Sequence, residues 1–300
     1  MAKPLCVKDQ EHVPYFRPND LRSALDWLAD HDAAIAAGCT DLFPATSAQQ
    51  LAGAVLDITA IPDLRGVSSD ATHWRLGATT TWTDIIEADL PPAFTALKLA
   101  AREVGSRQIQ NVATLAGNLC NASPAADGVP CLLALDAEVE LRSRHARRVV
   151  PLNDFITGVR AIDRARDELV TAILVPRSST RGTSSFLKLG ARKYLIISIA
   201  MVAARLAETD GIIDEVAISV GACSATAMRL PDVEAALIGQ PVSGAIAQRA
   251  TDTLIAGALS PIDDLRSDAS GRQVIAGELV RRCITALTPG APTSSKADAA

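Results

Sequence analysis

The feature that most constrains the fold of this 300-residue chain is a short polar segment at 177–185, with the sequence RSSTRGTSS. It offers no apolar residue to a core, and its Ser and Gly content is typical of a linker. Strand and helix patterns lie on both sides of it. Because 300 residues also exceed the usual size of one domain, we predict two α+β domains, at 1–176 and 186–287. The tail at 288–300 has no large apolar residue to bury and is expected to be disordered.

The first domain is expected to begin with a small βαβ-like lobe at 1–55. Asn19 can cap a helix that follows it. The apolar face of that helix recurs every three or four residues, at Leu21, Ala24, Leu25 and Leu28. Short apolar runs at 33–37 and 54–58 predict two buried strands, the first of which ends in a turn at Gly38.

The remainder of the first domain, 56–176, is expected to form a larger lobe. We predict strands at 75–78 and 169–175, a hairpin from 138–141 and 148–152, and helices at 82–86, 94–104 and 130–135. For the second domain we predict a strand meander at 185–189, 196–206 and 216–220, with a turn at Asp210–Gly211, followed by helices at 233–237, 246–254 and 273–287.

Composition excludes several classes of function. Twenty-nine basic and thirty-four acidic residues give a net charge of −5, so the chain lacks the excess of basic residues that a nucleic-acid binder needs. Aromatic residues make up only 3%, too few for surfaces on which bases stack. No run approaches the roughly 18 apolar residues of a membrane span. The N-terminal residues have no apolar signal-peptide core. We therefore expect no nucleic-acid or membrane partner and a cytoplasmic location.

Metal and nucleotide motifs are missing as well. The six cysteines include no CxxC pair, and none of the four histidines lies at ligand spacing from a cysteine, so we expect neither disulfides nor a metal site. The sequence contains no GxGxxG, GxxxxGK[ST], HExxH or GxSxG pattern. A Rossmann dehydrogenase, a P-loop enzyme, a zincin and an α/β-hydrolase therefore lose their main sequence support.

Two loops of small polar residues interrupt apolar segments, at 36–42 and 113–127. Small side chains let backbone amides approach a ligand, and consecutive amides can hold phosphate oxygens. Further donors are the side chains of Thr40, Thr114, Asn118 and Ser123. Asp41 and Asp127 can accept from sugar or polyol hydroxyls, or cap a helix. On residue chemistry alone, ordinary turns are the favoured interpretation of both loops, because small polar loops are common.

Taken together, these loops resemble two motifs of the FAD-binding medium subunits of molybdenum hydroxylases, the xanthine dehydrogenase and aerobic carbon monoxide dehydrogenase family. Residues 37–42 (AGCTDL) match an AGGTDL loop. Residues 114–127 (TLAGNLCNASPAAD) match T[IL][GA]GN…NASPAAD. Further similar stretches are 15–18 (YFRP), 132–139 (LLALDAEV) and 186–192 (FLKLGAR), in the order of the family over about residues 13–285.

The resemblance implies a role for each matching residue. The FAD diphosphate is held by the backbone of both loops, namely Ile35, Ala36, Ala37, Gly38, Cys39, Thr40, Asp41 and Leu42, and the turn Thr114, Leu115, Ala116 and Gly117. Asn118 and Ser123 complete the implied FAD-binding set. Asp127 contacts the flavin half, Val170 lines the isoalloxazine, and Lys188 lies near its pyrimidine edge, where a cation stabilises negative charge on a reduced flavin. Tyr194 is a weaker candidate for the flavin face. The alternatives are a helix N-cap for Asp127 and a solvated strand end for Lys188.

Two positions depart from the family pattern. Cys39 stands where the family often has glycine, and Ala116 replaces a glycine of the second loop. A β-carbon at residue 39 is tolerated if φ is negative, whereas a positive φ would lower the affinity for FAD. Thr40 and Asp41 stand where the carbon monoxide dehydrogenase branch has His-Ser, which counts against carbon monoxide as the substrate.

The resemblance implies a two-lobed FAD-binding domain of the vanillyl-alcohol-oxidase (PCMH-type) class, followed by a C-terminal domain of a small antiparallel sheet with helices. It also implies electron transfer within a hetero-oligomer. A large molybdopterin-binding subunit and a small [2Fe–2S] subunit are the implied partners, with NAD⁺ or another molecule as electron acceptor. A stand-alone flavoenzyme on the same fold and a flavin-free scaffold remain as alternatives.

Overall fold

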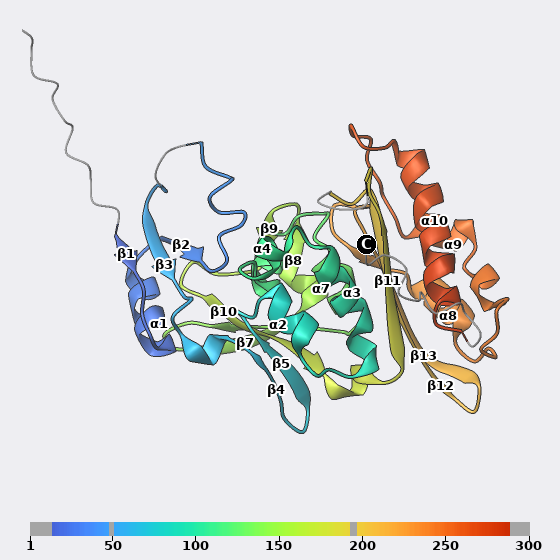
Figure 1. Ribbon diagram of the computed structural model, residues 1–300, viewed down its shortest axis with the longest axis horizontal. Helices are drawn as coiled ribbons and strands as arrows, with labels where there is room; N and C mark the ends of the chain where they lie inside the picture. Colours follow the sequence, from blue (N-terminus) through green and yellow to red (C-terminus); the bar gives the residue numbers. More distant parts are fainter. Residues whose placement is uncertain (1–13, 48–50, 193–196, 289–300) are drawn as a thin grey trace, which may run out of the picture.

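The computed structural model describes residues 14–47, 51–192 and 197–288, and within these ranges the chain forms three units along its long axis (Figure 1). The N-terminal lobe, blue in Figure 1, comprises β1 (Tyr15–Phe16), α1 (Leu21–Asp30), β2 (Ala33–Ala36) and β3 (Ala54–Asp57). Its sheet is parallel, with the order β1-β3-β2. The carboxyl ends of all three strands therefore meet at one edge, where ligands of open parallel sheets commonly bind.

The predicted first helix is present, but its cap differs from the expectation. The Asp20 side chain, and not that of Asn19, accepts the amide of Ser23 at 2.9 Å. The apolar face packs as the periodicity indicates. Together with strand and turn residues it forms the core of the lobe, which contains Ala24, Leu25, Leu28, Leu56, Ile58, Ile61, Leu64 and Leu169.

The larger lobe is built on an antiparallel sheet with the strand order β4-β5-β10-β6-β7. The strands of this sheet are β4 (Val67–Ser69), β5 (His73–Gly77), β6 (Glu138–Arg142), β7 (Arg147–Pro151) and β10 (Leu169–Pro176). The lobe also contains a separate short pair, β8 (Ile156–Gly158) and β9 (Ala161–Ile162). Its helices are η1 (Pro62–Leu64), α2 (Trp82–Glu87), η2 (Pro92–Phe94), α3 (Thr95–Glu103), α4 (Arg107–Gln110), α5 (Leu115–Cys120), α6 (Gly128–Leu133) and α7 (Leu152–Phe155). The predicted strands, the hairpin and the helices at 82–86, 94–104 and 130–135 are confirmed within a few residues.

The C-terminal unit holds a four-stranded antiparallel sheet with the order β11-β12-β13-β14. Its elements are η3 (Arg177–Thr180), β11 (Thr183–Leu189), β12 (Ala200–Thr209), β13 (Ile212–Gly221), β14 (Met228–Arg229), α8 (Pro231–Leu237), η4 (Ile246–Arg249), α9 (Asp252–Gly257) and α10 (Ala269–Thr285). The α+β class and the antiparallel C-terminal sheet with helices are confirmed, with β14 as an additional short strand.

Both faces of this sheet are buried, which explains the continuous apolar run in β12. Met201 and Ala203 belong to the core of the larger lobe. Val202 and Ala204, which alternate with them, belong to a second core under α8, α9 and α10. Because side chains alternate across a strand, one strand can serve two cores only if it is apolar at every position.

The segment 177–185 is more ordered in the structure than a polar linker would be. It contains η3 and the first residues of β11. The buried hydroxyl of Ser184 donates to the carbonyl oxygen of Ala93 at 2.6 Å and accepts the amide of Ala96 at 2.8 Å. These bonds attach β11 to the start of α3, so the segment joins the two units by fixed contacts. Of the tail predicted to be disordered, residues 289–300 lie outside the described part of the chain.

Candidate functional site

The first small-residue loop leaves β2 at the carboxyl edge of the parallel sheet. The backbone amides of Gly38–Leu42 have no hydrogen-bond acceptor among the described residues. Cys39 adopts a φ of +57°, in the left-handed region that glycine enters without strain. The positive φ is the case in which we expect a β-carbon at residue 39 to lower the affinity for FAD.

The second loop contains a helix that its polar composition does not indicate. Thr114 is the N-cap of α5, and its Oγ1 accepts the amide of Gly117 at 3.0 Å. The amide of Leu115 donates to the carbonyl oxygen of Thr80 at 3.0 Å. Ala116 has no acceptor for its amide among the described residues. Fewer amides of the Thr114–Gly117 turn are thus available to a ligand than the sequence predicts.

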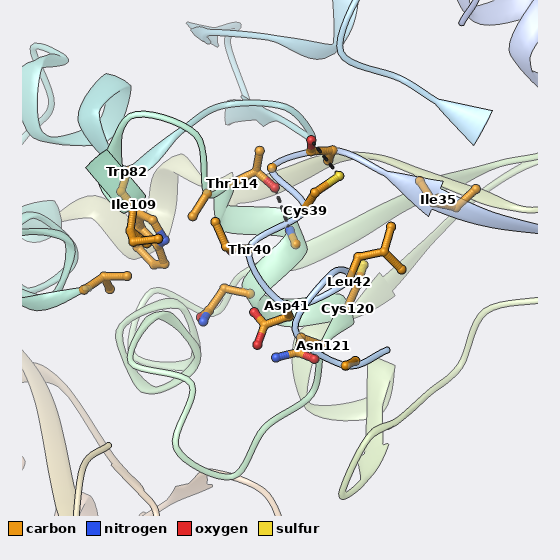
Figure 2. Close-up of a pocket in the computed structure, with 17 residues that line it drawn as sticks. Ile35, Cys39, Thr40, Asp41, Leu42, Trp82, Ile109, Thr114, Cys120 and Asn121 are labelled. Atoms are coloured by element: carbon orange, nitrogen blue, oxygen red, sulfur yellow. Dashed lines mark hydrogen bonds between the residues drawn. The ribbon is translucent and has the colours of Figure 1, made fainter. Parts of the chain in front are cut away.

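The two loops meet at Gly38. A β-carbon built on this residue would lie 2.2 Å from the carbonyl oxygen of Val112 and 2.7 Å from the Cα of Ala113. Only glycine permits such an approach of one backbone to another. Between the loops lies a cavity of about 480 Å³, shown in Figure 2. Its volume falls in the range typical of cofactor sites.

Most of the predicted loop residues line this cavity. From the predicted set it is lined by Ile35, Ala37, Gly38, Cys39, Thr40, Asp41, Leu42, Thr114, Gly117 and Asn118 (Figure 2). Residues that the sequence did not single out complete the wall, namely Ala45, Trp82, Val104, Ile109, Ala113, Cys120 and Asn121. These are mainly apolar side chains whose periodicity indicates only burial.

Several predicted residues do not line this cavity. Ala36 and Leu115 are buried in β2 and α5. The Ser123 hydroxyl accepts the amide of Ala125 at 3.3 Å, within its own turn. Tyr194 lies outside the described residues.

Val170 and Ala116 line a second, smaller cavity of about 220 Å³. It shares Ile35, Ala37, Gly117 and Cys120 with the first cavity. The remaining lining residues are Ala33, Ala34, Ile58, Ala78, Ile162, Arg164 and Leu169. Because these come from both the N-terminal lobe and the larger lobe, the second cavity lies between the two lobes, and Val170 itself packs in the core of the larger lobe.

Asp127 and Lys188 form a buried ion pair that lines neither cavity. The Lys188 Nζ lies 2.8 Å from Asp127 Oδ2, and the two side chains are only 6% and 10% exposed. The other oxygen, Oδ1, accepts the hydroxyl of Ser198 at 2.7 Å. Asp127 makes no side-chain cap to α6, and Lys188 is not a solvated strand end, so both structural alternatives for these residues are wrong. No sequence pattern singled out Ser198, which lies within an apolar run.

This ion pair is connected to the first cavity through Asn118. Asn118 lines the cavity, and its Oδ1 accepts the amide of Gly128 at 3.2 Å. Gly128 follows Asp127 directly, at the start of α6. The structure thus brings Asn118 of α5 next to the start of α6 and Asp127, whereas Val170 lines the second cavity together with Gly117.

Two thiols face the first cavity, and both are neutral at ordinary pH. Burial raises the pKa of Cys39, and burial raises the pKa of Cys120 to about 11. Within the described residues, no group of three or more His, Cys, Asp or Glu side chains could hold a metal ion. The same residues include no helix that is long and apolar enough to cross a membrane.

Residues 8–178 match the protein family described as the FAD binding domain in molybdopterin dehydrogenase. The chain belongs to this family. Residues 185–287 match a second family, the CO dehydrogenase flavoprotein C-terminal domain. Membership in the molybdopterin dehydrogenase family confirms the resemblance, the oxidoreductase class and FAD as the cofactor.

Relatives and solved structures agree with this assignment. The chain is 32% identical to the nicotine 6-hydroxylase medium subunit of Paenarthrobacter nicotinovorans, over 91% of this chain and 96% of that protein. It is 30% identical to the xanthine dehydrogenase FAD-binding subunit of Escherichia coli O157:H7, over 78% and 82%. A chain of the carbon monoxide dehydrogenase of Hydrogenophaga pseudoflava superposes with a TM-score of 0.83 at 26% identity, covering 92% of this chain and 96% of that chain.

Proposed function

We propose that this chain is the FAD-carrying medium subunit of a multi-subunit molybdenum hydroxylase. Two of its relatives are the medium subunit of a nicotine 6-hydroxylase and the FAD-binding subunit of a xanthine dehydrogenase. In the proposed complex a large subunit holds the molybdopterin cofactor and oxidises the organic substrate, and a small subunit carries [2Fe–2S] clusters. Electrons pass from these clusters through the FAD of this chain to NAD⁺ or another acceptor.

The observation that carries this proposal is the convergence of the two loops on one cavity. The unpaired amides of Gly38–Leu42 supply neutral donors, and successive amides in a loop suit phosphate oxygens. The contact of Gly38 with the Val112–Ala113 backbone keeps the second loop close enough to act on the same ligand. The cavity therefore fits a diphosphate that is held chiefly by the first loop. The amide of Ala116, which lines the second cavity, is a further donor where the two cavities meet.

Polar side chains on the cavity wall suit the sugar and polyol parts of FAD. The Oδ1 of Asn118 is engaged by Gly128, which leaves its NH₂ group to donate into the cavity. The carboxylate of Asp41 can accept from hydroxyl groups. Cys39 and Cys120 add uncharged surface because their thiols stay protonated.

We place the flavin end of FAD toward Lys188. Val170, which the resemblance assigns to the isoalloxazine, lines the second cavity. Lys188 lies on β11, in the C-terminal unit, and β11 is separated from β2 of the N-terminal lobe by the larger lobe (Figure 1). Bound FAD accepts and releases electrons in one- or two-electron steps. The ammonium group of Lys188, fixed by Asp127, provides a positive charge that favours the reduced form.

The spectrum and metal content of the purified protein test the proposal against its alternatives. Expressed together with its molybdenum and iron–sulfur subunits, the chain should carry flavin absorbance and should co-purify with molybdenum and iron. Flavin without either metal would instead indicate a stand-alone flavoenzyme. A chain that lacks flavin but joins the complex would indicate a scaffold.

Substitution of Lys188 tests the orientation of the cofactor. Lys188→Ala combined with Asp127→Asn avoids leaving a buried carboxylate without its cation, which is strongly destabilising. This double variant should bind FAD with a lower reduction potential. Lys98→Ala is the matched control, because Lys98 lies on α3 and donates to the carbonyl oxygen of Ala88, away from both cavities. An equal potential in the double variant and the control would contradict the placement of the flavin.

A further inference from the structure

Near the start of α10, the side chain of Arg272 is buried, with 3% of its surface exposed. Its Nη1 donates to the carbonyl oxygens of Ile199 at 2.5 Å and Ala222 at 2.9 Å, and its Nη2 lies 2.7 Å from Asp264 Oδ1. Its Nε is also buried and has no acceptor among the described residues. A buried ion pair is often no more stable than apolar residues of the same volume, so stability alone does not account for an arginine here.

The two carbonyl groups that this guanidinium binds belong to segments that reach the turn around Asp127. Next to Ile199, Ser198 donates its hydroxyl to Asp127 Oδ1 at 2.7 Å. The amide of Ala222 donates to the carbonyl oxygen of Pro124 at 2.9 Å. One side chain of α10 therefore supports two of the contacts that hold the turn at 124–127 against the C-terminal unit, alongside the Lys188–Asp127 ion pair.

Asp264 holds the guanidinium of Arg272 in place. Its Oδ1 accepts the amides of Arg266 at 2.7 Å and Ser267 at 3.3 Å, in addition to its contact with Arg272. The hydrogen bond from the Arg266 amide, with the two arginine side chains, holds the pKa of Asp264 well below its usual range. Because this carboxylate stays ionised and its position is set by its own loop, the guanidinium has a fixed anchor.

We propose that Arg272 is a positioning residue for the Lys188–Asp127 pair and thereby helps to set the reduction potential of the bound FAD. The proposal rests on the proposed function, in which Lys188 faces the flavin. Arg272 acts through Ser198, which holds one oxygen of Asp127 while Lys188 binds the other. Because Asp127 holds the Lys188 ammonium in place, a displaced Asp127 lets the ammonium move away from the flavin, and its effect on the reduced flavin weakens as their separation grows.

A double-mutant cycle between Arg272 and Ser198 tests this coupling. The variants are Arg272→Met, Ser198→Ala and the combination, each purified in the complex with FAD, and the readout is the midpoint potential of the flavin. Both single variants should lower the potential, and the combination should lower it no further than the larger single effect, because residues that act through one path are not additive. A wild-type potential in Arg272→Met, or additive shifts in the combination, would overturn the proposal.

Arg205→Met is the matched control. Arg205 lies on β12 and is as deeply buried, with 4% of its side chain exposed. It also joins the two units, since it donates to the carbonyl oxygen of Ala134 and pairs with Glu215. Its removal should lower the melting temperature without moving the flavin potential. If Arg205→Met lowers the flavin potential as much as Arg272→Met does, the shift reports only a less stable protein, and the proposal is overturned.

A second set of variants keeps the test decisive if Arg272→Met does not fold. Asp264→Asn leaves the guanidinium in place and weakens only its anchor, and the same cycle with Ser198→Ala then gives the same two outcomes. Failure of this inference is separable from failure of the proposed function. A wild-type chain without flavin contradicts the function, whereas a potential that responds to Lys188 but not to Arg272 or Asp264 contradicts only the positioning role.

Discussion

Gly38 lies so close to Val112 that a β-carbon on the glycine would be 2.2 Å from the valine carbonyl oxygen. The contact joins a loop that leaves the N-terminal parallel sheet to the segment that precedes α5 in the larger lobe. Both loops border the cavity of about 480 Å³, so this contact fixes the distance between the two sides of the proposed diphosphate site.

Gly38→Ala should therefore separate the loops. The new methyl group would meet backbone atoms, which cannot rotate away, so we expect a loss of about 1–3 kcal/mol in the free energy of unfolding and loss of FAD from the purified protein. Gly257→Ala is the control, because a β-carbon there meets nothing within 4 Å. Urea unfolding and the flavin content of both variants check the prediction, and full FAD occupancy in Gly38→Ala would refute it.

Cys39→Gly should bind FAD more tightly than the wild type. The φ of +57° costs a non-glycine residue roughly 1 kcal/mol, which corresponds to about fivefold in affinity if FAD binding orders the loop. Cys39→Ala retains the strain and removes only the thiol, so its affinity should stay close to that of the wild type. Titration of the apoproteins with FAD measures both, and equal affinities for the Gly and Ala variants would show that the backbone strain is irrelevant to binding.

Thr114→Val should weaken both the fold and the cofactor site. Loss of the Oγ1 acceptor leaves the Gly117 amide without its cap, at a cost of about 1 kcal/mol, and loosens the first turn of α5 beside the cavity. Thr251→Val removes the equivalent cap of α9, where Thr251 accepts the amide of Leu254, far from the loops. Both variants should melt earlier, but only Thr114→Val should bind FAD less tightly. Equal FAD affinities would argue against a role of α5 in binding.

The stability of the larger lobe should depend on Glu168 in acid. The hydrogen bonds from Arg148 lower the pKa of Glu168 and of Asp163 below their ordinary values. The folded protein therefore takes up these protons at lower pH than the unfolded chain does. The stabilisation is complete above the ordinary carboxyl pKa and is lost as the pH falls through the lowered values.

Glu168→Gln should remove part of this dependence. We expect the variant to be about 1 kcal/mol less stable than the wild type at neutral pH, with a smaller difference as the pH approaches about 3. Asp167→Asn, which changes an exposed carboxylate with no ion pair among the described residues, is the control and should follow the wild-type curve. Urea unfolding over this pH range measures the three curves, and parallel curves for wild type and Glu168→Gln would contradict the expectation.

Residue patterns predicted most of the secondary structure, and particular misses have physical reasons. The apolar spacing of Leu21, Ala24, Leu25 and Leu28 specified α1 because it corresponds to one face of a helix. The two residues of β1 are too few to show a period of two. The helix α5 escaped prediction because its small polar residues are also typical of loops, and its cap at Thr114 is visible only as a hydrogen bond.

The amino-acid sequence by itself determined which segments fold locally and which two loops are suited to phosphate, because periodicity and side-chain size act within a few residues. Tertiary structure alone decided that Gly38 contacts Val112, that Lys188 pairs with Asp127, and that Arg272 binds the carbonyl oxygen of Ile199. These contacts join residues that are at least 61 positions apart in the chain, so they arise only when the lobes and the C-terminal unit pack on shared cores. Burial then gives each contact its energetic weight, because water no longer competes for the polar groups.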